Sequence, residues 1–171
     1  MFNKEMAFKK IINDPYQVVD EMVEGIVLAH SDLLKFANNN KRAVVRKDAP
    51  IKDKVGVLIG GGSGHEPAFL GYVGKGLADG AAIGNVFASP SPDPIVDATK
   101  AINGGKGVVY MYGNYAGDIM NFDMAAEMCQ MEDIPVKTVL VTDDIASAPL
   151  DKKSERRGVA GDFYVFKIAG A

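Results

Sequence analysis

His65 and Asp118 are the two side chains whose type and setting best suit proton transfer. His65 lies in a glycine-rich stretch, and histidine ordinarily exchanges a proton near neutral pH, so it can act as a general acid or base. Asp118 ends the segment Asn-Tyr-Ala-Gly-Asp, and its carboxylate can accept a proton from a substrate hydroxyl. Each residue also has a structural interpretation, because both stand where a side chain can cap a following helix.

Glycine fills four of the five positions from Gly60 to Gly64. Such a stretch lets the backbone approach a ligand and direct N–H groups at phosphate or hydroxyl oxygens. It is not a dinucleotide fingerprint, because that motif needs glycine where His65 stands. Residues 71–76 have the glycine spacing of a nucleotide P-loop, but Leu77 follows where that motif has lysine. The sequence therefore predicts a turn that binds oxygen-rich groups, without a recognised ATP site.

Two other catalytic motifs are each excluded by one residue that differs from the motif. A zinc motif H-E-x-x-H starting at His65 would need histidine at position 69, where Phe69 stands. With two histidines and one cysteine in the chain, no metal site is predicted. A serine nucleophile at Ser63 would need glycine in place of His65. The pair Asp143-Asp144 could bind a divalent cation, but two adjacent acidic residues are more often solvated.

Composition indicates one ordinary domain over residues 1–171, with 47% hydrophobic and 24% charged residues. The 19 basic and 22 acidic residues give a net charge of −3 and form no basic stripe, so no nucleic-acid partner is expected. No apolar run is long enough to span a membrane, and no secretory signal is visible. Cys129 stands alone, which excludes an intramolecular disulfide and fits a reducing compartment. We expect a cytoplasmic protein.

Apolar runs alternate with helical patterns along the chain. Strands are predicted at residues 54–59, 80–87, 107–112 and 136–141. Helices are predicted at 14–36, 67–77, 93–102 and 118–131, and the ambiguous segment 157–171 favours a further helix. This order predicts an α/β fold with three α/β/α layers and a mostly parallel sheet. Five methionines, at 111, 120, 124, 128 and 131, are interpreted as core filling.

Three loops rich in Gly, Ser, Pro, Asn and Asp follow the predicted strands, at residues 60–66, 88–93 and 113–118. In parallel sheets, ligands bind outside the carboxyl ends of the strands, where these loops would meet. A shared site is one interpretation, and ordinary turn chemistry is the other. The proline-rich loop at 89–94 also fits a stiff connector. Together the loops bring His65 and Asp118 to one edge of the sheet.

Four motifs occur in order along the chain. They are Gly-Gly-Gly-Ser-Gly-His-Glu-Pro at 60–67, Phe-Ala-Ser-Pro-Ser-Pro-Asp at 87–93, Asn-Tyr-Ala-Gly-Asp at 114–118 with Asn121-Phe122, and Arg-Arg-Gly-Val-Ala-Gly at 156–161. In combination they resemble the K subunit of dihydroxyacetone kinases. The resemblance spans the whole chain but only the first half of such a subunit. In the family, a second lobe carries the histidine that binds the ketone covalently. The resemblance therefore implies either that residues 1–171 are the N-terminal lobe of a longer protein, which we favour, or that the chain is a truncated relative that cannot bind the substrate covalently.

The resemblance also implies roles for individual residues. Gly62 and Ser63, within the loop Gly61-Gly62-Ser63-Gly64, would contact substrate oxygens through the backbone. His65 would activate the hydroxyl, and Asp118 would be the general base. The chain itself would bind no cofactor. A separate L subunit would hold the nucleotide, either ADP recharged from phosphoenolpyruvate or ATP with magnesium, and the K subunit would form a homodimer.

Three positions depart from the family pattern, at Gly113, Phe69 and Ala116, where many members have Lys, His and Thr. The glycine changes the polarity of the pocket, so the substrate could be dihydroxyacetone or a related ketose such as erythrulose. A further alternative is a non-catalytic relative that binds dihydroxyacetone and acts as a transcriptional co-activator. The presence of both His65 and Asp118 favours catalysis, because a sensor needs no base.

Overall fold

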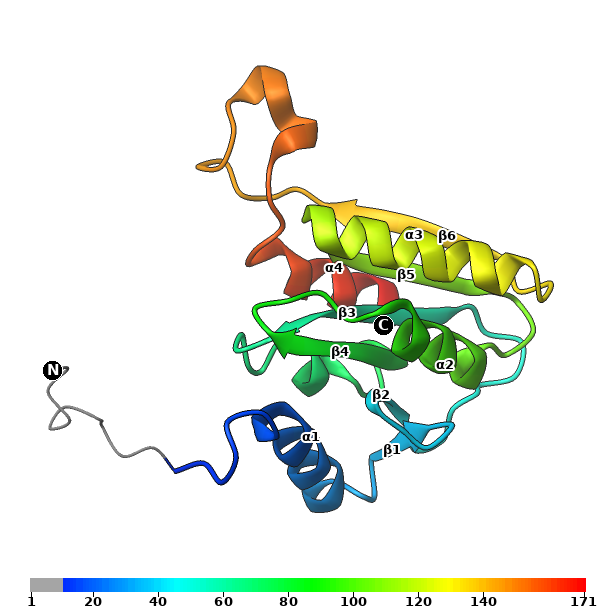
Figure 1. Ribbon diagram of the computed structural model, residues 1–171. Helices are drawn as coiled ribbons and strands as arrows, with labels where there is room; N and C mark the ends of the chain where they lie inside the picture. Colours follow the sequence, from blue (N-terminus) through cyan, green and yellow to red (C-terminus); the bar gives the residue numbers. More distant parts are fainter. Residues whose placement is uncertain (1–10) are drawn as a thin grey trace, which may run out of the picture.

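Six strands form one mixed sheet in the computed structural model, which describes residues 11–171 (Figure 1). Their spatial order is β1-β2-β4-β3-β5-β6. The strands are β1 (Leu34–Ala37), β2 (Asn40–Arg46), β3 (Gly56–Ser63), β4 (Gly80–Val86), β5 (Val108–Gly113) and β6 (Val136–Val141). The last four run parallel to one another. These are the four strands that the sequence predicts, so the expected mostly parallel α/β sheet is confirmed.

Strands β1 and β2 form an antiparallel hairpin, and β2 pairs antiparallel with β4. Helix α1 (Val18–Ala29) covers only the middle of the helix predicted over residues 14–36, so that prediction is wrong before Val18 and beyond Ala29. The hairpin turn is Asn38-Asn39, and both residues have positive φ, at 48° and 60°. A two-residue turn of this kind matches the twist of antiparallel strands, and asparagine tolerates the conformation. This hairpin was not predicted from the sequence.

Helices cover both faces of the sheet, which confirms the three-layer prediction (Figure 1). They are α1, α2 (Pro92–Ile102), α3 (Ala116–Gln130) and α4 (Gly161–Gly170), with 3₁₀ segments η1 (Leu70–Tyr72) and η2 (Leu150–Glu155). Leu58 and Ile59, neighbours in β3, point to opposite faces. Leu58 packs in the hydrophobic cluster under α2 and α3, and Ile59 packs in the cluster under α1 and α4. Both side chains are fully buried, as expected for a central parallel strand.

The helix predicted at residues 67–77 is replaced by turns around the short segment η1. Gly71, Gly74 and Gly76 each weaken a helix by about 1 kcal/mol relative to alanine, and Gly76 has a φ of +78°. Leu70 and Val73 are nevertheless buried against the sheet. The apolar residues that have helix-like spacing therefore pack a compact loop against the sheet. The ambiguous segment at the end of the chain does contain a helix, α4.

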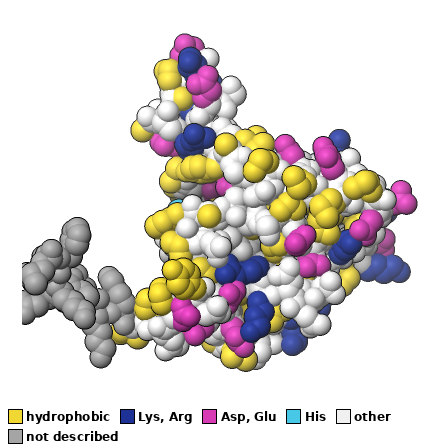
Figure 2. Space-filling model, viewed as in Figure 1, with side chains coloured by type: hydrophobic (Ala, Val, Ile, Leu, Met, Phe, Trp, Pro, Cys, Tyr) yellow, Lys and Arg dark blue, Asp and Glu magenta, His cyan; other side chains and the backbone are white. Residues whose placement is uncertain are grey.

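Helix α3 buries Phe122, Ala125 and Cys129, which recur at helical spacing. The core-filling interpretation of the methionines is wrong for Met120, Met124 and Met131, which are 61%, 49% and 79% exposed. Hydrophobic side chains accordingly reach the surface over α3 (Figure 2). Within residues 11–171, no helix is both long enough and apolar enough to cross a membrane.

An arm that follows β6 projects away from the sheet and carries η2 (Figure 1). Its base is held by the Asn114 amide, which donates hydrogen bonds to the carbonyl oxygens of Ser154 and Arg156 at 3.0 and 2.7 Å. The Asp143 carboxylate accepts hydrogen bonds from the amides of Val159 and Gly161, both at 2.8 Å. These bonds fix the start of α4 beside the carboxyl ends of β5 and β6.

Candidate functional site

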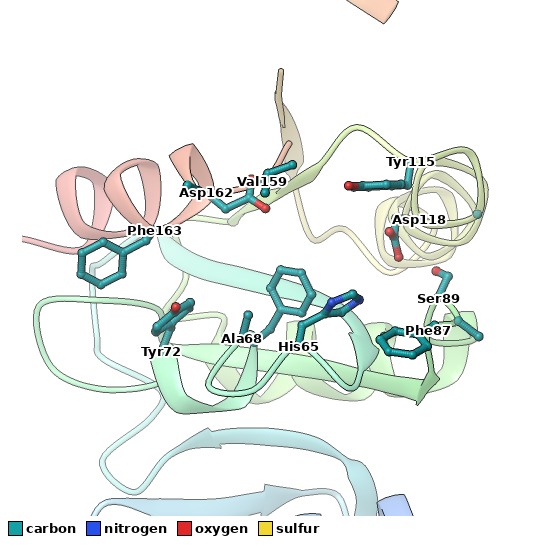
Figure 3. A pocket seen from close by; sticks show the side chains of 15 residues that line it. His65, Ala68, Tyr72, Phe87, Ser89, Tyr115, Asp118, Val159, Asp162 and Phe163 are labelled. Carbon is teal, nitrogen blue, oxygen red and sulfur yellow. The ribbon is translucent and has the colours of Figure 1, made fainter. Parts of the chain in front are cut away.

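A cavity of about 780 Å³ lies beyond the carboxyl ends of the parallel strands. Its walls come from the loops after β3, β4 and β5 and from the start of α4. Figure 3 shows His65 and Phe87 on one side of this space, and Asp118, Tyr115 and Asp162 on the other. The three loops predicted to converge from the sequence therefore do line one cavity.

The glycines at the end of β3 and directly after it are required by close packing against aromatic rings and neighbouring backbone. A methyl group on Gly61 would overlap the ring of Phe69, and one on Gly64 would lie 2.7 Å from the ring of Phe87. Gly64 also has a φ of +97°, which favours glycine. A methyl group on Gly62 would lie 2.7 Å from the backbone nitrogen of Ala88. The loop thus lets Phe69 and Phe87 reach the cavity wall.

Of the predicted loop residues, Gly62 and His65 line the cavity, whereas Gly61, Ser63 and Gly64 are not part of its lining. The buried Ser63 hydroxyl donates a hydrogen bond to the carbonyl oxygen of Gly84 at 2.8 Å. This bond ties β3 to β4. Contact of Gly61, Ser63 and Gly64 with a ligand stays a prediction.

His65 is exposed at the mouth of the cavity and packs beside two rings. Its centroid is 5.2 Å from that of Phe87 and 6.5 Å from that of Phe69. The backbone is fixed by a hydrogen bond from the Ala68 amide to the His65 carbonyl oxygen at 3.1 Å. The Glu66 carboxylate accepts a hydrogen bond from the Gly64 amide at 3.0 Å. Turns and the short 3₁₀ segment η1 follow His65, so the interpretation of this side chain as the cap of a following α-helix is wrong.

Asp118 lies in the first turn of α3 and its side chain enters the cavity (Figure 3). Its Oδ1 atom is buried and has no hydrogen-bond partner. Burial raises the pKa of this carboxyl group, while the Ser89 hydroxyl and the charge on His65 lower it in part. A carboxyl group in this setting is a stronger base than an ordinary surface aspartate.

The structure therefore brings His65 and Asp118 together although 52 positions separate them in the chain. Figure 3 shows the two side chains facing each other across the cavity. An imidazole and a carboxylate that line one cavity are both groups able to exchange a proton with a bound ligand. His30, the other histidine, is exposed directly after the end of α1 and is not part of the cavity lining.

Asp162, a third ionisable side chain in the same cavity beside His65 and Asp118, was not predicted from the sequence. This side chain is only 7% exposed, and its Oδ1 atom has no hydrogen-bond partner. Burial, followed by the negative charges of Asp143 and Asp118, raises the pKa of Asp162 to about 7. Asp162 directly follows the last quoted motif, but no spacing in the sequence indicates that α4 turns it into the cavity.

Tyr115 was also missed as a lining residue. The guanidinium carbon of Arg157 lies 5.3 Å from the centre of its ring, and Arg157 donates a hydrogen bond to the Asn114 carbonyl oxygen at 3.0 Å. This cation–π contact couples the arm to the cavity wall. Among residues 11–171, no three His, Cys, Asp or Glu side chains are grouped to hold a metal ion.

The protein is thus an α/β protein with a cavity at the carboxyl ends of its parallel strands, the place where proteins of this class bind small molecules. Residues 24–171 match the Dak1 domain, and the chain belongs to this family. The resemblance to the K subunit of dihydroxyacetone kinases is thereby confirmed.

Three relatives show how close this similarity is. The dihydroxyacetone-binding subunit of PTS-dependent dihydroxyacetone kinase 2 from Listeria innocua is 54% identical over 163 residues, which cover 95% of this chain and 49% of that subunit. The L-erythrulose kinase of Pectobacterium atrosepticum is 46% identical over 94% of this chain and 27% of its own. The crystal structure of the C. freundii dihydroxyacetone kinase in complex with AMP-PNP and Mg²⁺ matches with a TM-score of 0.85 at 38% identity, covering 96% of this chain and 30% of that one. The chain thus spans about half the length of the Listeria subunit.

Proposed function

We propose that this chain is the ketose-binding lobe of a dihydroxyacetone kinase, a transferase component that acts with a nucleotide-bearing L subunit. The observation that carries this proposal is the placement of His65 and Asp118 on opposite walls of one cavity. The similarity to the Listeria subunit supports dihydroxyacetone as the substrate. The second lobe, with its ketone-binding histidine, and a homodimer are further parts of the proposal.

The proposed chemistry is proton removal from a terminal hydroxyl of the ketose. As the hydroxyl oxygen forms a bond to the phosphorus atom, the bond from phosphorus to the donor oxygen breaks and the proton passes to Asp118. Burial of Asp118 raises its pKa and so strengthens it as a base. His65 holds the same hydroxyl by a hydrogen bond, which orients the oxygen for attack.

The lining of the cavity supports a phosphoryl donor held by a partner. Phosphoryl transfer needs positive charge beside the phosphate oxygens, commonly from Lys, Arg or Mg²⁺. None of the fifteen residues that line the cavity is Lys or Arg. The C. freundii relative was crystallised with AMP-PNP and Mg²⁺, and it is a chain more than three times as long as the matched part. We propose that ADP, or ATP with magnesium, stays on the L subunit.

The cavity does not select a three-carbon substrate by size. Its volume of about 780 Å³ is in the range that holds drug-sized ligands, so it leaves room for a four-carbon ketose. The similarity to an L-erythrulose kinase agrees with this room. Erythrulose therefore remains the alternative substrate, to be compared with dihydroxyacetone in the same assay.

The test is phosphoryl transfer by the complete protein that carries this chain, supplied with an L subunit. Asp118→Asn and His65→Ala should each lower kcat by about 10²–10⁴-fold, the usual contribution of a general acid or base. Asp123→Asn is a matched control, because Asp123 is exposed one turn further along α3 and outside the cavity lining. Near-normal rates for both cavity variants would refute the assignment. Dihydroxyacetone binding without any turnover by the unmodified protein would instead identify the non-catalytic co-activator.

A further inference from the structure

Asp162 occupies a recess shaped by two glycines. A methyl group on Gly113 would lie 3.2 Å from its Oδ2 atom, and one on Gly158 would lie 2.9 Å from its Oδ1 atom. Both glycines are buried, at the end of β5 and in the arm. The recess opens into the cavity beside Val159 and Phe163, which are apolar. The two glycines therefore leave room for the Asp162 carboxyl group in the cavity wall. One of its oxygens, Oδ1, has no hydrogen-bond partner there.

The groups facing Asp162 disfavour its charged form. Asp143, after β6, and Asp118, on α3, are the neighbouring charges that act on it, and both are acidic. Tyr115 is close enough for the charge of Asp162 to raise the pKa of the tyrosine, and Arg157 lies over the Tyr115 ring. The first turn of α4 favours an anion, but burial and the two acidic neighbours outweigh it, and the pKa of Asp162 is raised to about 7.

Asp118 differs from Asp162 in having groups that favour its anion. The Ser89 hydroxyl and His65 lower the pKa of Asp118 against the effect of burial, whereas burial and both neighbouring charges raise the pKa of Asp162. When two neighbouring carboxyl groups are coupled in this way, the better-stabilised one ionises first and the other keeps its proton. The cavity thus contains one carboxylate that accepts a hydrogen bond and one carboxyl group that can donate one.

We propose that protonated Asp162 donates a hydrogen bond to an uncharged carbonyl or hydroxyl oxygen of the bound ketose, and so orients the sugar and sets its affinity. The inference rests on the proposed function, because it needs a ketose in this cavity. It assigns the two aspartates different tasks: Asp118 receives the reacting proton, and Asp162 holds an oxygen elsewhere on the sugar. The same geometry disfavours an anionic ligand group at Asp162, because the acidic side chains of Asp118 and Asp143 lie close to this position.

The experiment measures dihydroxyacetone affinity calorimetrically from pH 5.5 to 8.5 with the complete protein. The unmodified protein should lose about tenfold in affinity per pH unit above 7, as Asp162 ionises and stops donating. Asp162→Asn keeps a donor at every pH, so it should bind within a few-fold of the unmodified protein at pH 6 and show no such decline. Asp162→Val should bind about tenfold more weakly at pH 6, because one hydrogen bond is lost. Asp123→Asn is the control that should keep the decline.

A carbon-13 NMR titration of the Asp162 carboxyl group measures the proton without any ligand, and it should show a proton lost near pH 7. A carboxyl group that is fully ionised at pH 6 would overturn the inference. So would a decline in affinity that Asp162→Asn leaves unchanged, because another group of the cavity would then cause it. Failure of the proposed function has a different signature, namely no ketose binding by the unmodified protein at any pH, and it would remove this inference as well.

Discussion

Asp79 and Asp162 lie at opposite ends of the parallel strands, and both are more than nine-tenths buried. Asp79 precedes β4 and is fully paired: Lys54 donates to it at 2.6 Å, Arg46 at 2.9 Å, and the Val57 amide at 2.9 Å. Asp162, at the carboxyl end, has one oxygen without a partner and only acidic groups acting on it. The same residue type is thus satisfied at one end of the sheet and left unsatisfied at the other.

The paired carboxylate of Asp79 stabilises the fold, whereas the partly unpaired carboxyl group of Asp162 does not. A buried charge without a partner costs several kcal/mol, so proteins normally pair it or neutralise it. At the amino ends of β3 and β4, two cations and a backbone amide do so. At the carboxyl ends, Asp118 and Asp162 keep unpaired oxygens inside a cavity. Such unsatisfied groups are expected where a ligand supplies the missing partners.

The largest effect on stability is expected at Asp79. Asp79→Ala removes the common partner of Arg46 and Lys54 and should lower the free energy of unfolding by about 3–5 kcal/mol. Urea unfolding measures this difference, with Asp123→Asn as the exposed control. The catalytic rate per folded molecule should not change. A loss below about 1 kcal/mol would mean that the ion pairs of Asp79 do not stabilise the fold.

Asp162→Asn should change the free energy of unfolding in the opposite direction, because it should stabilise the folded protein at alkaline pH. The pKa of Asp162 is about 7 in the folded protein against an ordinary value of 3.8. Between about pH 4 and 7 the folded state therefore keeps a proton that the unfolded state has lost, and stability falls as pH rises through this window. Asp162→Asn lacks this dependence, so at pH 8 its advantage over the unmodified protein should be about 2–4 kcal/mol larger than at pH 4. Parallel stability profiles for the two proteins would contradict the description of Asp162.

Lys54→Met should have the smallest effect. The Lys54 side chain is 32% exposed, and Asp79 keeps Arg46 and the Val57 amide when the lysine is removed. We expect a loss of about 1 kcal/mol, near the upper value for partly exposed ion pairs. In a double-mutant cycle with Asp79→Ala, the lysine should contribute little once the aspartate is gone. Additive losses would show that the two residues do not act as a pair.

The sequence predicted the parts of the fold that depend on local pattern. The four parallel strands are buried apolar runs, and the glycine- and proline-rich loops after them mark the edge where the cavity forms. His65 and Asp118 could be placed at that edge because parallel strands put their carboxyl ends together. The hairpin was missed because its main signal is the turn Asn38-Asn39, and the segment before it continues a helical spacing.

The role of Asp162 could not be predicted, because its surroundings come from distant parts of the chain. Gly113, Asp118, Asp143 and Gly158 approach it only after β5, β6 and α4 are packed together. The helix predicted at 67–77 was wrong for a similar reason: Leu70 and Val73 have helical spacing but are buried by the sheet while glycines interrupt the helix. The local sequence pattern predicts helices and strands, whereas the charge state of a side chain depends on tertiary contacts.

The most direct test of the central claim is a crystal structure of the complete protein with dihydroxyacetone bound. We predict the ketose in the cavity at the carboxyl ends of β3 and β5, with one terminal hydroxyl oxygen about 2.6–3.2 Å from an Asp118 carboxylate oxygen and from the His65 ring. A ketose bound outside this cavity, or bound inside it with neither side chain in reach of a hydroxyl, would contradict the account.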